Sequence, residues 1–181
     1  MRIGDRHIGH GHPPYIIAEL GVNHDGDPDR AVALAHKAAD AGADAVKLQL
    51  FRTDLLMGRE AALAAYQADA GERDPWAMLR RLELPLDAMA SVLNAARARG
   101  LHAVITVFST ELIADAESLG VDAYKTASPD VIHEPLLRGL AATGRPLIIS
   151  TGAATAEEVR RAREVIEGAA DRVAFTHCVS S

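Results

Sequence analysis

Short apolar runs alternate along this chain with longer amphipathic segments. The apolar runs are rich in β-branched residues and occupy positions 15–20, 45–50, 102–108, 123–127, 147–150 and 173–179. Runs of this length and composition predict short buried strands. The segments between them are rich in alanine and leucine and predict helices. One apolar helix face is expected at Leu86, Met89, Leu93 and Ala96.

Capping signals mark where these helices begin and end. Asp27 followed by Pro28 is typical of a helix start, and residues 155–158 (TAEE) form a capping-box sequence. Glycines that tolerate a left-handed backbone are expected to end five helices, at Gly42, Gly100, Gly120, Gly144 and Gly168. Strict alternation of helix and strand predicts an α/β fold with a parallel sheet, either an open doubly wound sheet or a (β/α)8 barrel.

Two regions interrupt the alternation within what the 181 residues predict to be a single domain. Residues 1–14 predict a short hairpin ahead of the first strand. Its three histidines could bind a metal, but the surrounding glycines and prolines provide no rigid scaffold; they are His7, His10 and His12. Residues 52–85 form a long insertion after the second strand. Such insertions often act as lids, while Tyr66 and Trp76 fit simple packing equally well.

Composition excludes several classes of protein. With 49% apolar and 24% charged residues the chain is typical of a globular protein, and no apolar stretch is long enough to predict a membrane span. The net charge is −6, no basic run occurs and only 4% of residues are aromatic, so nucleic acid is not an expected partner. A single cysteine and the lack of an apolar signal-peptide core favour a cytoplasmic location.

Polar residues stand near the carboxyl ends of the predicted strands, where parallel α/β folds bind their ligands. Lys47 and Lys125 lie inside apolar strands, a costly position unless the lysine is paired or functional. The neighbouring polar residues are Glu19, Asn23, His24, Gln49, Thr106, Ser128, Asp130, Ser150, Thr151, His177 and Cys178. Two lysines with several hydroxyls predict a cationic pocket for a small phosphorylated or carboxylated anion.

Structural roles remain open for some of these residues. The two lysines could reach solvent at the strand ends, and Glu19 could serve either to neutralise one of them or in catalysis. His177 fits a core histidine better than a ligand. Cys178 follows an apolar run and is expected to be a small buried hydrophobe.

Five ordered motifs resemble the N-acetylneuraminate (sialic acid) synthase family. Residues 17–26 (IAELGVNHDG) are similar to the first-strand signature of the family, and residues 43–49 (ADAVKLQ) to its second strand. Residues 124–128 (YKTAS), 150–152 (STG) and 177–181 (HCVSS) resemble its fourth, fifth and sixth strands in the right order. The resemblance covers essentially the whole chain.

The resemblance implies a (β/α)8 barrel of the TIM type and a transferase that forms a carbon–carbon bond. Such enzymes condense phosphoenolpyruvate with an N-acetylated sugar aldehyde, N-acetylmannosamine or a relative, to give a nonulosonic acid and phosphate. A divalent metal, Mn²⁺ or Mg²⁺, polarises the aldehyde. By resemblance, Gln49 and Asp130 would contact the sugar and Glu19 would act near the metal as a general acid/base or orienter. Phosphoenolpyruvate would be held by Lys47, Thr106, Lys125, Ser128 and Ser150.

The chain also departs from the family pattern. Residues 105–108 read ITVF where the family has Ser-Thr-Pro-Phe, and residues 128–130 read SPD where it has Ser-Gly-Glu. The metal-binding histidines of the family lie on its seventh and eighth strands, beyond residue 181, and its small C-terminal domain caps the site of the partner subunit in a homodimer. We therefore expect about six β/α units here, and a 181-residue chain that is inactive alone.

Two other functions stay open from the residues. A strand lysine in a barrel can form a Schiff base, which would make the protein an aldolase-type lyase. A relative that keeps the anion pocket without catalysis is the second alternative.

Overall fold

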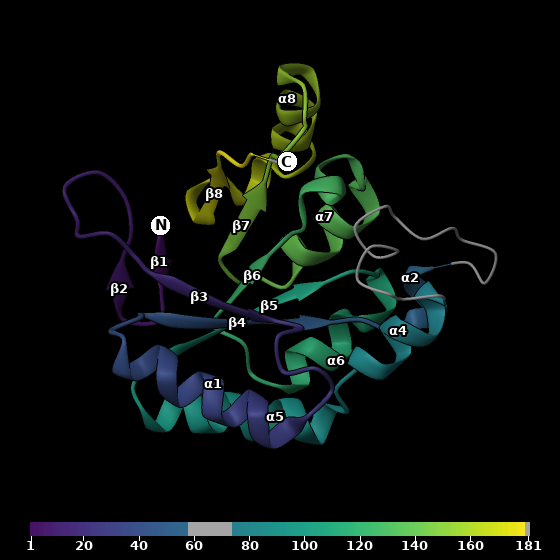
Figure 1. Cartoon of the computed structure of the whole chain (residues 1–181). Helices are drawn as coiled ribbons and strands as arrows, with labels where there is room; N and C mark the ends of the chain where they lie inside the picture. Colours follow the sequence, from purple (N-terminus) through teal and green to yellow (C-terminus); the bar gives the residue numbers. More distant parts are fainter. Residues whose placement is uncertain (58–73, 180–181) are drawn as a thin grey trace.

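The computed structural model describes residues 1–57 and 74–179, and its centre is a parallel sheet (Figure 1). All six apolar runs contain a strand, as predicted, although several strands are shorter than the runs. The strands are β3 (Ile17–Gly21), β4 (Ala45–Leu50), β5 (His102–Val107), β6 (Ala123–Lys125), β7 (Leu147–Ser150) and β8 (Val173–Thr176).

The order of the strands decides between the two predicted sheet architectures. Each strand pairs with the next one along the chain, from β3 to β8, and every pairing is parallel. A doubly wound sheet would reverse its order at a switch point. Without a reversal, right-handed crossovers place all the connecting helices on one face and leave the other face turned inward. The fold is therefore of the (β/α)8 TIM-barrel type, and the described residues contain six of its strands and the five helical connections between them.

The helices begin where the capping signals predict. In α1 (Pro28–Asp40) the Asp27 carboxylate accepts hydrogen bonds from two backbone N–H groups, and α8 (Ala156–Val165) begins with a complete capping box. The other α-helices within the described residues are α2 (Thr53–Leu56), α4 (Pro75–Leu82), α5 (Leu86–Ala98), α6 (Ile113–Ser118) and α7 (Glu134–Ala142). The same part of the chain also forms the 3₁₀ helices η1 (Thr110–Leu112), η2 (Ser128–Ile132) and η3 (Glu167–Arg172).

The insertion at residues 52–85 contributes α2 and α4 to the described structure, with Trp76 in α4. Tyr66 lies outside the described residues. The glycine prediction holds at four positions with φ near +80° or +64°: Gly42, Gly100, Gly120 and Gly144. It is wrong at Gly168, which lies inside η3, because α8 ends at Val165 and passes directly into that 3₁₀ helix.

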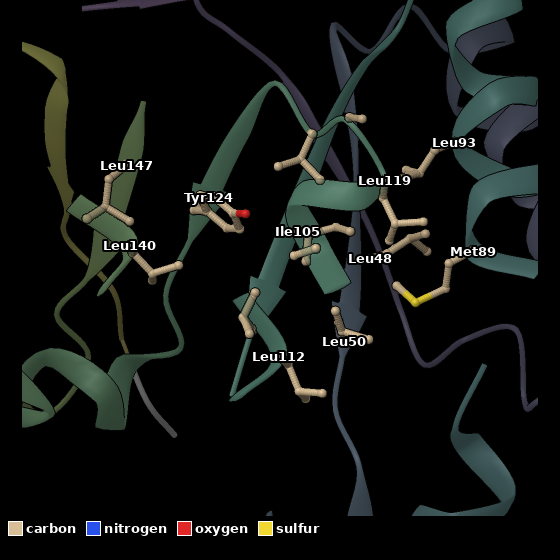
Figure 2. Close-up of a cluster of buried hydrophobic side chains, with 14 of the residues drawn as sticks. Leu48, Leu50, Met89, Leu93, Ile105, Leu112, Leu119, Tyr124, Leu140 and Leu147 are labelled. Carbon is tan, nitrogen blue, oxygen red and sulfur yellow. The ribbon is translucent and has the colours of Figure 1, made fainter. Parts of the chain in front are cut away.

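Apolar side chains fill both faces of the sheet. On the outer face, Leu48, Ile105 and Leu147 pack against the helices in the main hydrophobic core (Figure 2). The predicted face of α5 joins this core, where Met89 and Leu93 are fully buried. A second, smaller cluster lies on the inner face and consists of Ile3, Ala45, Val104, Ala123 and Ile148.

An N-terminal hairpin closes the amino end of the inner face, as predicted. It pairs β1 (Arg2–Ile3) with β2 (Arg6–His7), and its Ile3 is fully buried in the inner cluster. Arg6 forms an ion pair with Asp44 at 2.6 Å, and the ring of His102 lies 3.1 Å from Asp5 Oδ1. The hairpin is therefore fixed to the starts of β4 and β5. We call it the plug.

The plug does not bring its histidines into a metal site. The rings of His7 and His12 stack with centroids 5.6 Å apart. Throughout residues 1–57 and 74–179, no group of three or more His, Cys, Asp or Glu side chains gathers in a way that could hold a metal ion.

Among the described helices, none combines the length and the apolar character needed to cross a membrane.

Replacing Ile3 by alanine tests the plug. Ile3→Ala removes a fully buried side chain, so we expect the free energy of unfolding to fall by about 2–5 kcal/mol in a denaturant titration. Ile16→Ala is the matched control, because that side chain is 53% exposed. Equal losses of stability in the two variants would contradict a packing role for Ile3.

Candidate functional site

Strand alternation places a polar layer directly above the inner apolar cluster. Two residues beyond Ala45, Val104, Ala123 and Ile148 on their strands come Lys47, Thr106, Lys125 and Ser150, which therefore face the same side. In the register, Glu19 on β3 lies opposite Lys47. The structure thus brings together five of the predicted site residues at the carboxyl-terminal half of the sheet. We call these five the polar layer: Glu19, Lys47, Thr106, Lys125 and Ser150.

Lys47 is the most enclosed charge of the polar layer. Its side chain is 5% exposed, its ammonium donates a hydrogen bond to Thr106 Oγ1 at 3.0 Å, and it lies 2.5 Å from Glu19 Oε2. Burial lowers the pKa of Lys47, Glu19 opposes this shift, and the charge of Lys125 lowers the pKa further. Glu19 therefore neutralises Lys47, one of the two roles that the sequence left open, while its own side chain remains half-exposed.

Lys125 provides the second cation of the layer. Its ammonium donates a hydrogen bond to Ser150 Oγ, and Ser150 is itself almost fully buried. The backbone N–H of Ser150 donates to Thr126 Oγ1 at 3.2 Å, which fixes β7 to β6 at this level. Two ammonium groups that repel each other and one carboxylate leave the layer with an excess of positive charge. A bound anion would relieve that repulsion.

The remaining predicted residues lie around this layer. Ser128 Oγ accepts a hydrogen bond from the Gly152 backbone N–H at 3.1 Å and so joins η2 to the loop after β7. Burial raises the pKa of Asp130, and a backbone hydrogen bond to Ala127 opposes the shift. Within the described residues, its buried Oδ2 atom has no hydrogen-bond partner. Gln49 follows Lys47 on the same face of β4 and is half-buried. Sugar contacts by Gln49 and Asp130 stay predictions.

Two expectations near the end of the chain are wrong. Cys178 is only partly buried, and its sulfur lies 3.2 Å from Thr176 Oγ1. That hydrogen bond lowers the pKa of the Cys178 thiol to about 7, with Lys125 contributing in the same direction. His177 is exposed rather than a core residue. Both residues follow β8, which ends at Thr176 instead of continuing through the apolar run.

His24 is a buried polar residue for which the sequence patterns predicted no role. It is 2% exposed, and its Nδ1 accepts a hydrogen bond from the Gly26 backbone N–H at 3.0 Å. Burial lowers the pKa of His24, while a backbone hydrogen bond to Gly21 raises it. The only sign of this site in the sequence is a histidine that follows a predicted strand and precedes a glycine by two residues. Its burial depends on packing of the turn against α4, which the local sequence does not reveal.

Gly21 connects this turn to the polar layer. Its φ is +50°, and the pairing of β3 with β4 shifts register between Glu19 and Gly21. A Cβ atom at this position would lie 3.0 Å from Glu19 Oε1 and 3.6 Å from Gln49 Nε2. Glycine therefore gives the Glu19 carboxylate the space it occupies beside Lys47.

The donor set for a divalent metal is not assembled within the described residues. No group of three suitable side chains is present there, and the carboxylate of the polar layer, Glu19, faces an ammonium group. The described residues of this chain therefore do not form a metal site on their own.

The lowered pKa of His24 predicts a pH-dependent stability. The folded protein disfavours the charged ring, so this contribution is fully present above the unfolded pKa of 6.5 and is lost as the pH falls below it. We expect His24→Gln to flatten the decline in the free energy of unfolding between pH 6.5 and about pH 5. The exposed His10, changed to glutamine, is the control, and identical slopes for wild type and His24→Gln would refute the prediction.

Comparison with known proteins gives a consistent result. The NeuB family model matches residues 34–181. The chain is 34% identical over 182 residues to spore coat polysaccharide biosynthesis protein SpsE of Bacillus subtilis, covering 99% of this chain and 48% of that protein. It is 34% identical over 174 residues to N,N'-diacetyllegionaminic acid synthase of Legionella pneumophila, covering 92% of this chain and 49% of that protein.

A solved structure agrees in fold and sequence. The N-acetylneuraminic acid (sialic acid) synthetase of Leptospira borgpetersenii, in complex with citrate, superposes with a TM-score of 0.88 at 27% identity, covering all of this chain and 59% of that one. The chain spans about half the length of the curated relatives it matches. From the family match, the identities and the shared fold, this chain belongs to the NeuB family.

Proposed function

We propose that this chain is the phosphoenolpyruvate-binding part of an enzyme of carbohydrate biosynthesis. The enzyme condenses phosphoenolpyruvate with an N-acetylated sugar aldehyde, N-acetylmannosamine or a relative, consumes one water molecule, and releases a nonulosonic acid and phosphate. The single observation that carries the proposal is the pair of lysines, Lys47 and Lys125, in one hydroxyl-lined layer. Relatives named as legionaminic, pseudaminic and N-acetylneuraminate-9-phosphate synthases support the product class.

The charge of the layer suits this substrate. Phosphoenolpyruvate carries a phosphate and a carboxylate, and two ammonium groups on different strands can meet both. The hydroxyl groups of Thr106 and Ser150 already hydrogen-bond to the lysines and can turn towards the same oxygens. Ser128 is the next hydroxyl, at the start of η2. Supporting evidence from a relative is that the Leptospira synthetase is in complex with citrate, another small polycarboxylate.

Glu19 is the acid–base group of the proposal. The water that the reaction consumes must lose a proton when it attacks the carbon that bears the phosphate oxygen, and the ionised carboxylate of Glu19 can accept that proton as a general base. Glu19 lies at the edge of the layer with half of its side chain exposed, so it can reach a substrate while keeping contact with Lys47. A divalent cation, Mn²⁺ or Mg²⁺, would polarise the aldehyde. We propose that its ligands, and the dimer partner, involve parts of the whole protein outside these residues.

Binding by the chain itself tests the lysine pair. We expect residues 1–181 to bind phosphoenolpyruvate in isothermal titration calorimetry. Lys47→Met and Lys125→Met should each weaken binding by about 10- to 100-fold, because each removes a charged hydrogen-bond donor to the anion. Lys37→Met is the matched control, since Lys37 is an exposed lysine in the last turn of α1. Equal affinity in all three variants would rule out this pocket.

Turnover tests the role of Glu19. In the full-length protein supplied with Mn²⁺, phosphoenolpyruvate and N-acetylmannosamine, Glu19→Gln should lower the rate of phosphate release by about 10²- to 10⁴-fold, the range for loss of a general base. The same variant should still bind phosphoenolpyruvate. We expect no phosphate release from residues 1–181 alone. No release from the full-length protein with any N-acetylated hexosamine or its phosphate would contradict the substrate class.

A further inference from the structure

The hydrogen-bond ladder between β6 and β7 changes its acceptor at the level of the polar layer. The two strands are parallel neighbours (Figure 1), and the Thr126 backbone N–H donates to Ile148 O at 2.9 Å. In a regular parallel ladder, the backbone N–H of Ser150 would come next and would donate to the Thr126 carbonyl oxygen. It donates instead to the Thr126 hydroxyl oxygen, Oγ1, at 3.2 Å. A side chain therefore takes the place of a backbone acceptor.

The same exchange occurs one step further along both segments. The Gly152 backbone N–H donates to Ser128 Oγ at 3.1 Å. The cause is the turn of the chain after β6, because this strand ends at Lys125 and the 3₁₀ helix η2 begins at Ser128. A backbone that turns away from β7 no longer offers its carbonyl oxygens to that strand. Two hydroxyl groups supply the acceptors in their place.

The contact between Thr126 and Ser150 is enclosed. Each residue is 1% exposed, so water does not satisfy the Ser150 backbone N–H. A buried N–H without an acceptor costs about as much as a lost hydrogen bond. Thr126 directly follows Lys125, and strand alternation turns its side chain away from the inner face where an anion would bind. Thr126 therefore acts on the backbone of Ser150 and not on the anion.

The Ser150 side chain carries this contact into the polar layer. Its Oγ accepts the hydrogen bond from the Lys125 ammonium, which leaves the hydroxyl proton free to point at a ligand. The two lysines differ here: Lys47 has a carboxylate partner in Glu19, whereas the described partner of Lys125 is a hydroxyl group. The direction of the Lys125 ammonium therefore depends on where Ser150 lies.

We propose that Thr126 is a positioning residue of the polar layer: its hydroxyl fixes the backbone of Ser150, so that the Ser150 hydroxyl holds the Lys125 ammonium where an anion binds. This inference rests on the proposed function for the identity of the anion. Without the Thr126 acceptor, the Ser150 N–H must find another partner, and the Ser150 hydroxyl moves with its backbone. A lysine that is held in place beforehand loses less conformational entropy on binding than a free one.

A set of four variants separates this role from a merely structural one. Thr126→Val removes the acceptor and keeps the shape of the side chain, and Thr126→Ser restores the acceptor. Ser150→Ala removes the hydroxyl that lies between Thr126 and Lys125. Thr53→Val is the matched control, because Thr53 is fully buried and its hydroxyl donates to Glu83 Oε1, but it begins α2 and is not part of the polar layer.

The first measurement needs no ligand. In residues 1–181, the exchange of the Lys125 ammonium protons with water is followed by ¹⁵N NMR, because a hydrogen-bonded ammonium exchanges its protons more slowly. We expect about tenfold faster exchange in Ser150→Ala and in Thr126→Val, the effect of one hydrogen bond. Thr126→Ser and Thr53→Val should keep the wild-type rate. A wild-type rate in Thr126→Val overturns the inference.

The second measurement is phosphoenolpyruvate affinity by calorimetry, arranged as a double-mutant cycle. Ser150→Ala and Thr126→Val should each weaken binding about tenfold. The double variant should bind no more weakly than Ser150→Ala alone, because Thr126 acts through the hydroxyl that is already missing. Losses that add up in the double variant, or an equal loss in Thr53→Val, would show a general loosening of the fold and overturn the inference.

The two measurements keep the two proposals apart. If the wild type does not bind phosphoenolpyruvate, the proposed function falls, while the NMR rates still decide the role of Thr126. If Thr126→Val does not fold, Thr126→Ala replaces it, because alanine also lacks the acceptor and places no methyl group against the Ser150 N–H. An unchanged exchange rate at Lys125 in that variant overturns the inference.

Discussion

Burial of the Lys47 ammonium is the constraint on which the rest of the site depends. An unpaired ammonium on the inside of a sheet is expensive, and a second lysine nearby adds to the cost. The chain meets the cost with contacts from both neighbouring strands, Glu19 on β3 and Thr106 on β5. These contacts require a fixed register across three strands and a bulge at the end of β3. The strand register and the bulge in β3 therefore stabilise the charged form of Lys47.

The apolar residues that stabilise the fold and the polar residues of the site follow each other on the same strands. On β4 through β7, the inward residue near the amino end is apolar and packs on the plug, and the inward residue two positions later is polar. In the inner apolar cluster, the small side chains of Ala45 and Ala123 leave room for the larger side chain of Ile3. The polar layer thus lies directly on the inner apolar cluster. The cluster keeps water away from that side of the layer and so strengthens its electrostatic interactions.

Sequence patterns predicted the periodic features well, because strands, helix caps and glycine stops are set by neighbours within a few residues. The lysines and hydroxyls were found for the same reason: a polar residue in an apolar run is conspicuous. The misses have longer-range causes. The prediction that Gly168 ends a helix is wrong because the 3₁₀ helix η3 follows closely after α8. The prediction that Cys178 is buried is wrong because β8 ends at Thr176. The burial of His24 depends on packing of its turn against α4, which the periodicity of the sequence does not reveal.

The plug has a consequence for the order of folding. Ile3 shares its cluster with residues from β4, β5, β6 and β7, so its binding surface exists only once most of the sheet has formed. The plug, which precedes the strands in the chain, therefore cannot pack until those strands have assembled. Contacts between such distant parts of a chain form late and slow the search for the native state. We therefore expect the plug to pack late in folding, rather than to be the nucleus from which the fold grows.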